Sequence, residues 1–68
     1  MFVTKENWPE VKQDLEAGIA RIRFNDDGDT VYIATESFNG YDIPLRFLKQ
    51  LHRKGDLPES LLKRLGKI

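Results

Sequence analysis

The sequence contains no cysteine, only one histidine and no long hydrophobic run. Without cysteine it cannot form a disulfide, and it has too few of the nitrogen and sulfur ligands that structural zinc sites use. No apolar stretch approaches the ~20 residues that a membrane-spanning helix requires. The first residues also lack the basic and then apolar order of a secretory signal peptide. We therefore expect a cytoplasmic protein with no cofactor and no contact with a membrane.

Motifs for catalysis are also missing. The single histidine, His52, is followed by Arg53 and Lys54, and no serine or carboxylate stands in a recognisable pattern with it. No glycine-rich phosphate loop occurs. A chain of 68 residues forms one domain and has few residues to spare for a concave pocket. We therefore expect a non-enzymatic protein whose single domain comprises residues 1–68.

Charge is distributed unevenly, although the formal net charge is zero. Residues 1–43 carry four basic and nine acidic side chains, a balance of −5. Residues 44–68 carry seven basic and two acidic side chains, a balance of +5. One interpretation is that the two halves of the domain attract each other. The other is that the basic half offers a surface to an acidic partner.

Residues 19–36 form two strand-like runs on either side of Asp27-Gly28. Aspartate and glycine tolerate the positive φ angles of a type I′ turn, so we expect a hairpin with a two-residue loop. The register that this loop sets places four apolar side chains on one face: Ile22, Phe24, Val31 and Ile33. A two-stranded ribbon is not stable alone, so this face needs a cover of helices.

Each proline marks the start of an expected helix. Two positions before each proline stands a residue that can cap a helix: Asn7 before Pro9, Asp42 before Pro44 and Asp56 before Pro58. A glycine ends each helix: Gly18, Gly55 and Gly66. The expected helices span about residues 9–17, 44–54 and 58–65, each with an apolar stripe for the core.

The stretch between the hairpin and the second helix contains Asn39-Gly40, which favours another tight turn. A two-residue turn there would place Tyr41 and Ile43 on the face opposite Ile33, so either the sheet is covered on both faces or the stretch is a loop or a bulge. We favour a short third strand or a loop. We expect an α+β fold in the order helix, β-hairpin with this optional third strand, helix and helix. The helices pack on one face of a small antiparallel sheet.

The main candidate binding surface is basic and belongs to the second and third helices. Six cations lie opposite the leucines: Arg46, Lys49, Arg53, Lys63, Arg64 and Lys67. Such a surface can bind phosphate groups or an acidic protein. The same pattern is typical of cations that are merely solvated near helix C-termini, where the helix dipole favours them.

The short connection between these helices also permits a helix-turn-helix motif for DNA binding. The outward side chains of the reading helix would then be Ser60, Lys63, Arg64 and Lys67. The start of that helix carries Asp56 and Glu59, however, and their carboxylates would repel phosphate groups where base contacts are usually made.

Aromatic residues give two weaker candidates. Phe38 and Tyr41 flank Asn39-Gly40 and could form a protein-binding loop, although burial of at least one of the rings in the core is the alternative. The strand residues Arg21, Arg23 and Tyr32 could stack a nucleic-acid base. Their simpler interpretation is that Tyr32 packs against the arginine stems.

A cation site is the last candidate. The spacing of Asn25, Asp27, Asp29 and Glu36 matches positions 1, 3, 5 and 12 of a calcium-binding loop. Thr30 stands where such a loop needs glycine, and the following residues are typical of a strand. We therefore assign these aspartates to a solvated turn and expect no metal.

These observations predict a small intracellular protein-binding module with a regulatory role, which contacts another protein through its basic helical surface or its aromatic loop. The alternative is a nucleic-acid-binding protein that uses the basic helical hairpin. A third hypothesis is self-association, in which the acidic first helix of one copy meets the basic helices of another.

Overall fold

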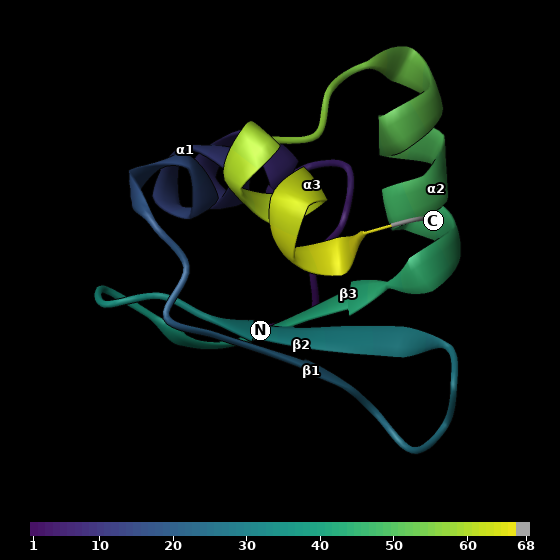
Figure 1. Ribbon diagram of the computed structural model, residues 1–68, viewed down its shortest axis with the longest axis horizontal. Coiled ribbons are helices and arrows are strands. Elements are labelled where there is room, and N and C mark those ends of the chain that lie inside the picture. The colour runs from purple at the N-terminus through teal and green to yellow at the C-terminus, as the bar shows by residue number, and fades with distance from the viewer. Residues whose placement is uncertain (67–68) are drawn as a thin grey trace.

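A computed structural model describes residues 1–66 and confirms the expected α+β fold (Figure 1). Its elements are α1 (Trp8–Ala17), β1 (Arg21–Phe24), β2 (Thr30–Ala34), β3 (Asn39–Pro44), α2 (Leu45–Lys54) and α3 (Glu59–Leu65). The strands form one antiparallel sheet in the order β1-β2-β3. All three helices lie over the same face of this sheet (Figure 1).

The hairpin has the predicted register but a different turn. Phe24 pairs with Val31, as the alternation of apolar residues requires. The predicted type I′ turn is wrong, because Gly28 is the only turn residue with a positive φ angle and its N–H donates to the carbonyl of Asn25 at 3.1 Å. The carboxylate of Asp27 instead accepts the N–H of Asp29 at 2.8 Å. This local bond of an aspartate side chain stabilises a wider turn with Asp27 at negative φ.

The third strand is present, and a bulge decides which of its residues face the core. Val31 pairs with Ile43 and Ile33 with Tyr41, but the register shifts after Ile33 so that Ala34 pairs with Asn39. Tyr41 and Ile43 therefore share the buried face of Val31 and Ile33. The extra residue of a bulge changes the face of every following side chain, which removes the conflict in the sequence pattern.

The turn before β3 precedes Asn39-Gly40, so the tight turn that this pair could have formed is not the one used. Residues 35–38 form the connection, in which the N–H of Thr35 donates to the carbonyl of Phe38 at 2.7 Å and the N–H of Phe38 donates to the Thr35 hydroxyl at 3.0 Å. Asn39-Gly40 lies inside β3, and Gly40 has φ 129°. Glycine fits that position because residues with a side chain rarely adopt so positive a φ angle.

The predicted helices are correct to within one residue at each end, whereas their predicted side-chain caps are wrong. None of the three helix starts has a side-chain capping bond. The Asn7 carboxamide accepts the N–H of Thr4 at 2.7 Å, Asp42 belongs to β3, and Asp56 bonds to α1. The glycines do end the helices, as expected: Gly18, Gly55 and Gly66.

The core lies between the sheet and the helices. Its buried side chains come from every helix, from β2 and β3, and from the segments outside them: Val3, Trp8, Val11, Leu15, Val31, Ile33, Tyr41, Ile43, Leu48, Leu51, Leu57 and Leu61. The predicted quartet Ile22, Phe24, Val31 and Ile33 does lie on this face. β1 is an edge strand, however, and Phe24 remains 55% exposed whereas its partner Val31 is 0% exposed.

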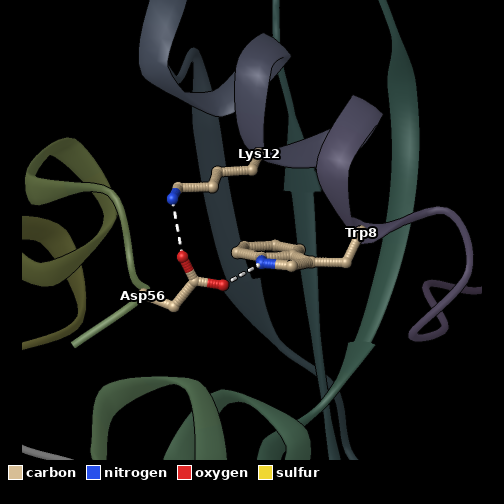
Figure 2. A network of polar contacts seen from close by, with 3 residues as sticks. All are labelled: Trp8, Lys12 and Asp56. Atoms are coloured by element: carbon tan, nitrogen blue, oxygen red, sulfur yellow. Dashed lines mark hydrogen bonds and ion pairs between the residues drawn. The ribbon is translucent and has the colours of Figure 1, made fainter. Parts of the chain in front are cut away.

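Asp56 connects α1 to the segment between α2 and α3 (Figure 2). Its carboxylate accepts the indole N–H of Trp8 at 3.0 Å and forms an ion pair with Lys12 at 2.6 Å. The pKa of Asp56 is lowered, chiefly by the bond from Lys12 and then by that from Trp8, and the pKa of Lys12 is raised by the same contact. The Trp8 ring also contacts Phe47 of α2 edge to face, with the ring centres 5.9 Å apart.

A second carboxylate connects α1 to the sheet. Asp14 accepts the hydroxyls of Tyr41 at 2.6 Å and Thr35 at 2.7 Å, together with that of Ser37. The bonds from Ser37, Tyr41 and Thr35, in this order of effect, lower the pKa of Asp14 below its ordinary value of 3.8. Burial, and then the bond to Asp14, raises the pKa of Tyr41 from 10.0 to about 12.

We predict that Asp56→Ala loosens α1, because it leaves the Trp8 N–H without an acceptor and Lys12 without its partner. The melting temperature should fall by roughly 4–8 °C, the change that about 1 kcal/mol produces in a domain of this size. Trp8 is the only tryptophan, so its fluorescence emission should shift to the red as water reaches the ring. Asp56→Asn keeps an acceptor for the Trp8 N–H, so its melting temperature should fall by less than that of Asp56→Ala. An unchanged melting temperature in Asp56→Ala would contradict this bridging role.

The pKa shifts predict loss of stability at both ends of the pH range. Below about pH 4 the unfolded chain binds more protons than the folded one at Asp14 and Asp56, so the free energy of unfolding decreases as pH falls. Between pH 10 and about 12 the folded chain retains the Tyr41 proton that the unfolded chain loses, so stability decreases as pH rises.

Tyr41→Phe should therefore reduce the loss of unfolding free energy between pH 8 and pH 12 by roughly 1–2 kcal/mol, as measured by urea titration. Tyr32→Phe is the matched control, because the hydroxyl of Tyr32 bonds to Asn39 and not to Asp14. If Tyr41→Phe and the wild type lost equal unfolding free energy between pH 8 and pH 12, the loss could not be due to the Tyr41 hydroxyl.

Candidate functional site

The candidate site lies along α2, whose sequence separates leucines from cations. Leu48 and Leu51 are buried in the core, whereas Arg46, Lys49 and Arg53 are all exposed. Their spacing of three and four residues places these cations on one stripe, since a helix turns once in 3.6 residues. The structure thus confirms the predicted exposure of this part of the basic surface.

The N-terminal segment places an exposed aromatic ring beside this stripe. The N–H of Val3 donates to the carbonyl of Asp42 at 2.9 Å, and the N–H of Asp42 donates to the carbonyl of Met1 at 2.8 Å. The segment therefore lies as an extended chain along the outer edge of β3. Since side chains alternate in an extended chain, Val3 enters the core and Phe2 remains 58% exposed.

Phe2 and the start of α2 line a groove of about 350 Å³, together with Asp29 and Thr30 of the hairpin. A shallower groove of about 290 Å³ adjoins it and shares Phe2, Pro44 and Arg46. The N–H of Leu45 donates to the carbonyl of Asp29 at 2.7 Å, which fixes the start of α2 against the hairpin turn. The surface termed the α2 groove below takes its residues from both grooves: Phe2, Asp29, Thr30, Pro44, Leu45, Arg46, Phe47 and Lys49.

The cations of α3 lie at another place. A guanidinium N–H of Arg64 donates to the carbonyl of Ile19 at 3.3 Å, and Ile19 lies near Thr35, after the end of β2. The α2 groove includes Thr30, at the start of β2. The structure therefore separates the Arg64 guanidinium from Arg46 and Lys49, because they lie near opposite ends of β2. Lys63 is exposed on α3, and Lys67 lies outside the described residues.

Within the part of the chain that the structure describes, the α2 cations have no ionic partner. Within residues 1–66 the single ion pair joins Lys12 to Asp56. Lys12 belongs to the acidic half of the chain and Asp56 to the basic half. The pair is therefore not a case of the basic half contributing a cation to the acidic half. Attraction between the halves therefore does not engage Arg46, Lys49 or Arg53 in ion pairs.

The geometry of α3 differs from that expected of a reading helix in a helix-turn-helix motif. α3 packs on α1, where the Ser60 hydroxyl donates to the carbonyl of Leu15 at 2.9 Å. Ser60 is therefore turned inward, and the prediction that it faces outward is wrong. Leu61 is fully buried beside it, so the N-terminal part of α3 contributes to the core.

The aromatic loop offers less surface than the sequence suggests. Tyr41 is only 6% exposed, and its hydroxyl is bonded to Asp14, so the expectation that at least one of the two rings is buried is confirmed. Phe38 is 38% exposed and packs on Tyr41 with the ring centres 4.6 Å apart. Of the two candidate binding residues, only Phe38 presents part of its ring to solvent.

On the outer face of the sheet, the Arg23 guanidinium lies over the Tyr32 ring, 5.0 Å from its centre. This is the packing that the simpler interpretation of Arg21, Arg23 and Tyr32 predicts, and it uses the ring face that a base would stack on. Arg21 is exposed nearby on the same face.

The four residues of the calcium-loop pattern are not brought together. The Asn25 carboxamide donates to the Thr30 hydroxyl, and the Asp27 carboxylate accepts backbone N–H groups of its own turn. Glu36 follows β2 and lies at the other end of this strand from Asp27 and Asp29. These side chains stabilise turns and do not converge on one point.

No protein family, curated protein or solved structure matches this chain. Among residues 1–66, no helix has both the length and the apolar character needed to cross a membrane.

Sequence reasoning missed two exposed aromatic rings, Phe2 and Phe24. For Phe2 a signal was available, because adjacent residues of an extended segment cannot both face the core and Val3 is the better core residue. For Phe24 there was none, since the alternation of apolar residues looks the same in an edge strand and in a central one.

We predict that replacing Arg46, Lys49 and Arg53 together by glutamine leaves stability nearly unchanged, because these exposed side chains form no ion pair within the described chain. The free energy of unfolding should change by less than about 1 kcal/mol. Lys12→Gln, which breaks the ion pair with Asp56, is the control and should lower the melting temperature. A large decrease in the free energy of unfolding of the triple variant would mean that these cations stabilise the fold.

Proposed function

We propose that this protein is a small, non-enzymatic binding module with a regulatory role in the cytoplasm, and that the α2 groove docks an acidic segment of another protein. The observation that carries the proposal is the exposed Phe2 ring beside Arg46 and Lys49. A phenylalanine that is 58% exposed in a groove offers an apolar anchor to a partner. The adjoining cations add attraction for carboxylates.

Both parts of this surface have the composition of protein-binding sites. Aromatic residues and arginine are enriched in the buried centre of interfaces, and charges at the rim accelerate and orient the encounter. A partner segment with a large apolar side chain flanked by glutamate or aspartate would fill the groove and neutralise Arg46 and Lys49. Arg53 continues the stripe along α2 and extends this favourable field.

Nucleic acid is the competing ligand, and the surroundings of the groove argue against it. Asp29 lines the groove, and Asp26 and Asp27 belong to the same turn. These carboxylates repel any anion, but a phosphate backbone carries a charge at every nucleotide and cannot avoid them, whereas a short segment can place its few carboxylates at Arg46 and Lys49. The net charge of zero also gives no general attraction to nucleic acid. The separation of Arg64 from the α2 cations further reduces the continuous basic surface that a duplex would contact.

The proposal can be tested by selecting peptides from a random phage-displayed library on the immobilised protein. We expect enrichment of sequences that combine acidic residues with a large apolar one. A synthetic copy of an enriched peptide should bind at least about tenfold more weakly to Phe2→Ala and to Arg46→Glu/Lys49→Glu. Lys63→Glu/Arg64→Glu makes the same change of charge on α3, outside the groove, and should bind as the wild type does.

Two results would overturn the proposal. One is the absence of any enriched peptide, or enrichment of basic ones. The other is binding of a labelled oligonucleotide with affinity that falls steeply as salt increases and that is lost in Arg46→Glu/Lys49→Glu. The second result would replace the protein partner by nucleic acid.

A further inference from the structure

The outer edge of β1 combines free backbone groups with an exposed aromatic ring. β1 pairs with β2 alone among the described strands, whereas the outer edge of β3 is partly covered by the segment around Phe2. Phe24 is 55% exposed on the helix-covered face, next to the partly buried Ile22. This edge shares no residue with the α2 groove, which is lined by Phe2, the start of α2, and Asp29 and Thr30 of the hairpin.

The direction of the free backbone groups follows from the hydrogen bonds of the hairpin. The N–H of Asn25 donates to the carbonyl of Thr30 at 3.1 Å, so the backbone N–H and C=O groups of Asn25 point toward β2. In an antiparallel ladder this direction alternates from one residue to the next. The N–H and C=O groups of Ile22 and Phe24 therefore point away from β2, toward the open edge.

The side chains along this edge also alternate in character. Ile22 and Phe24 lie on the helix-covered face, and Arg21 and Arg23 lie exposed on the other face. A strand added here would place every second side chain against the apolar pair and the intervening ones beside the arginines. The edge thus selects for alternating apolar and acidic residues.

We propose that this edge of β1 binds an extended segment of a partner protein in which apolar and acidic residues alternate. The segment becomes a fourth strand, a mode of recognition in which backbone bonds give affinity and alternate side chains give specificity. Its bonds go to Ile22 and Phe24, its apolar side chains cover Phe24, and its carboxylates lie beside Arg21 and Arg23. This inference is independent of the α2 groove.

A second copy of the chain is a poor occupant of the same edge. Antiparallel pairing of two β1 strands in which Ile22 and Phe24 of one copy both bond to Phe24 and Ile22 of the other would place Arg23 opposite Arg23. Like charges directly opposite each other on one face destabilise a pair of strands. Charged residues on an edge are a common protection against self-pairing, and here they also determine the charge of the segment that fits.

The test uses two synthetic heptapeptides that alternate valine with either glutamate or lysine. Binding is followed by amide hydrogen exchange and by NMR chemical shifts of the labelled protein. The glutamate peptide should slow exchange at the amides of Ile22 and Phe24 by about tenfold or more, with little change at Arg21 and Arg23, whose amides already face β2. The lysine peptide should have no effect.

The matched variants separate this site from the α2 groove. Arg21→Glu/Arg23→Glu should lose binding of the glutamate peptide and gain binding of the lysine peptide. Arg46→Glu/Lys49→Glu should retain the wild-type preference.

Three results would overturn the inference: no protection of Ile22 and Phe24 by the glutamate peptide, equal binding of both peptides, or shifts confined to the α2 groove. Protection of these amides that increases with protein concentration in the absence of peptide would show a second copy as the occupant, and would overturn it too.

Discussion

A single buried sheet face is the constraint on which the rest of this structure depends. Three short strands can support a core only if one face of the sheet is apolar along its length and covered by helices. The bulge after Ile33 satisfies this condition, because it places Tyr41 and Ile43 on the same face as Val31 and Ile33. Leu15, Leu48 and Leu61, one from each helix, complete the core against that face and are fully buried.

Two aspartates hold the helical layer in position. Asp56 bonds to Trp8 and Lys12, and Asp14 accepts three hydroxyls from the end of the sheet. Each joins segments that are far apart in the sequence, and each carboxylate has a lowered pKa because its partners stabilise the charged form. Polar contacts of this kind fix how α1 sits on the sheet and on the α2–α3 connection, which apolar packing alone does not specify.

Outside this core, the surface has two places where an exposed phenylalanine lies beside cations. At the α2 groove an exposed phenylalanine adjoins cations that form no ion pair within residues 1–66. At the edge of β1 another exposed phenylalanine adjoins free backbone groups and two arginines. Both places combine apolar and basic character, and both therefore favour a partner that is apolar and acidic. They differ in form, because one is a groove beside a helix and the other is an open sheet edge.

The sequence by itself determined the features that depend on near neighbours along the chain. Alternation of apolar residues fixed the face shared by Ile22 and Val31, and glycine fixed the ends of the helices. The 3.6-residue period predicted the exposed stripe that begins at Arg46. The order of helices and strands, and hence the fold class, followed from these local patterns. The basic part of the candidate site, Arg46 and Lys49, was predictable for the same reason.

Only the tertiary structure decided the features that depend on distant residues. It placed the bulge after Ile33, moved Asp56 from a helix cap to a bond with Trp8, and buried Tyr41. It also made β1 the edge strand and separated Arg64 from the α2 cations. The physical reason is that a carboxylate, a ring or a strand edge takes the best partner that the folded chain brings near, and local sequence does not record which segments meet.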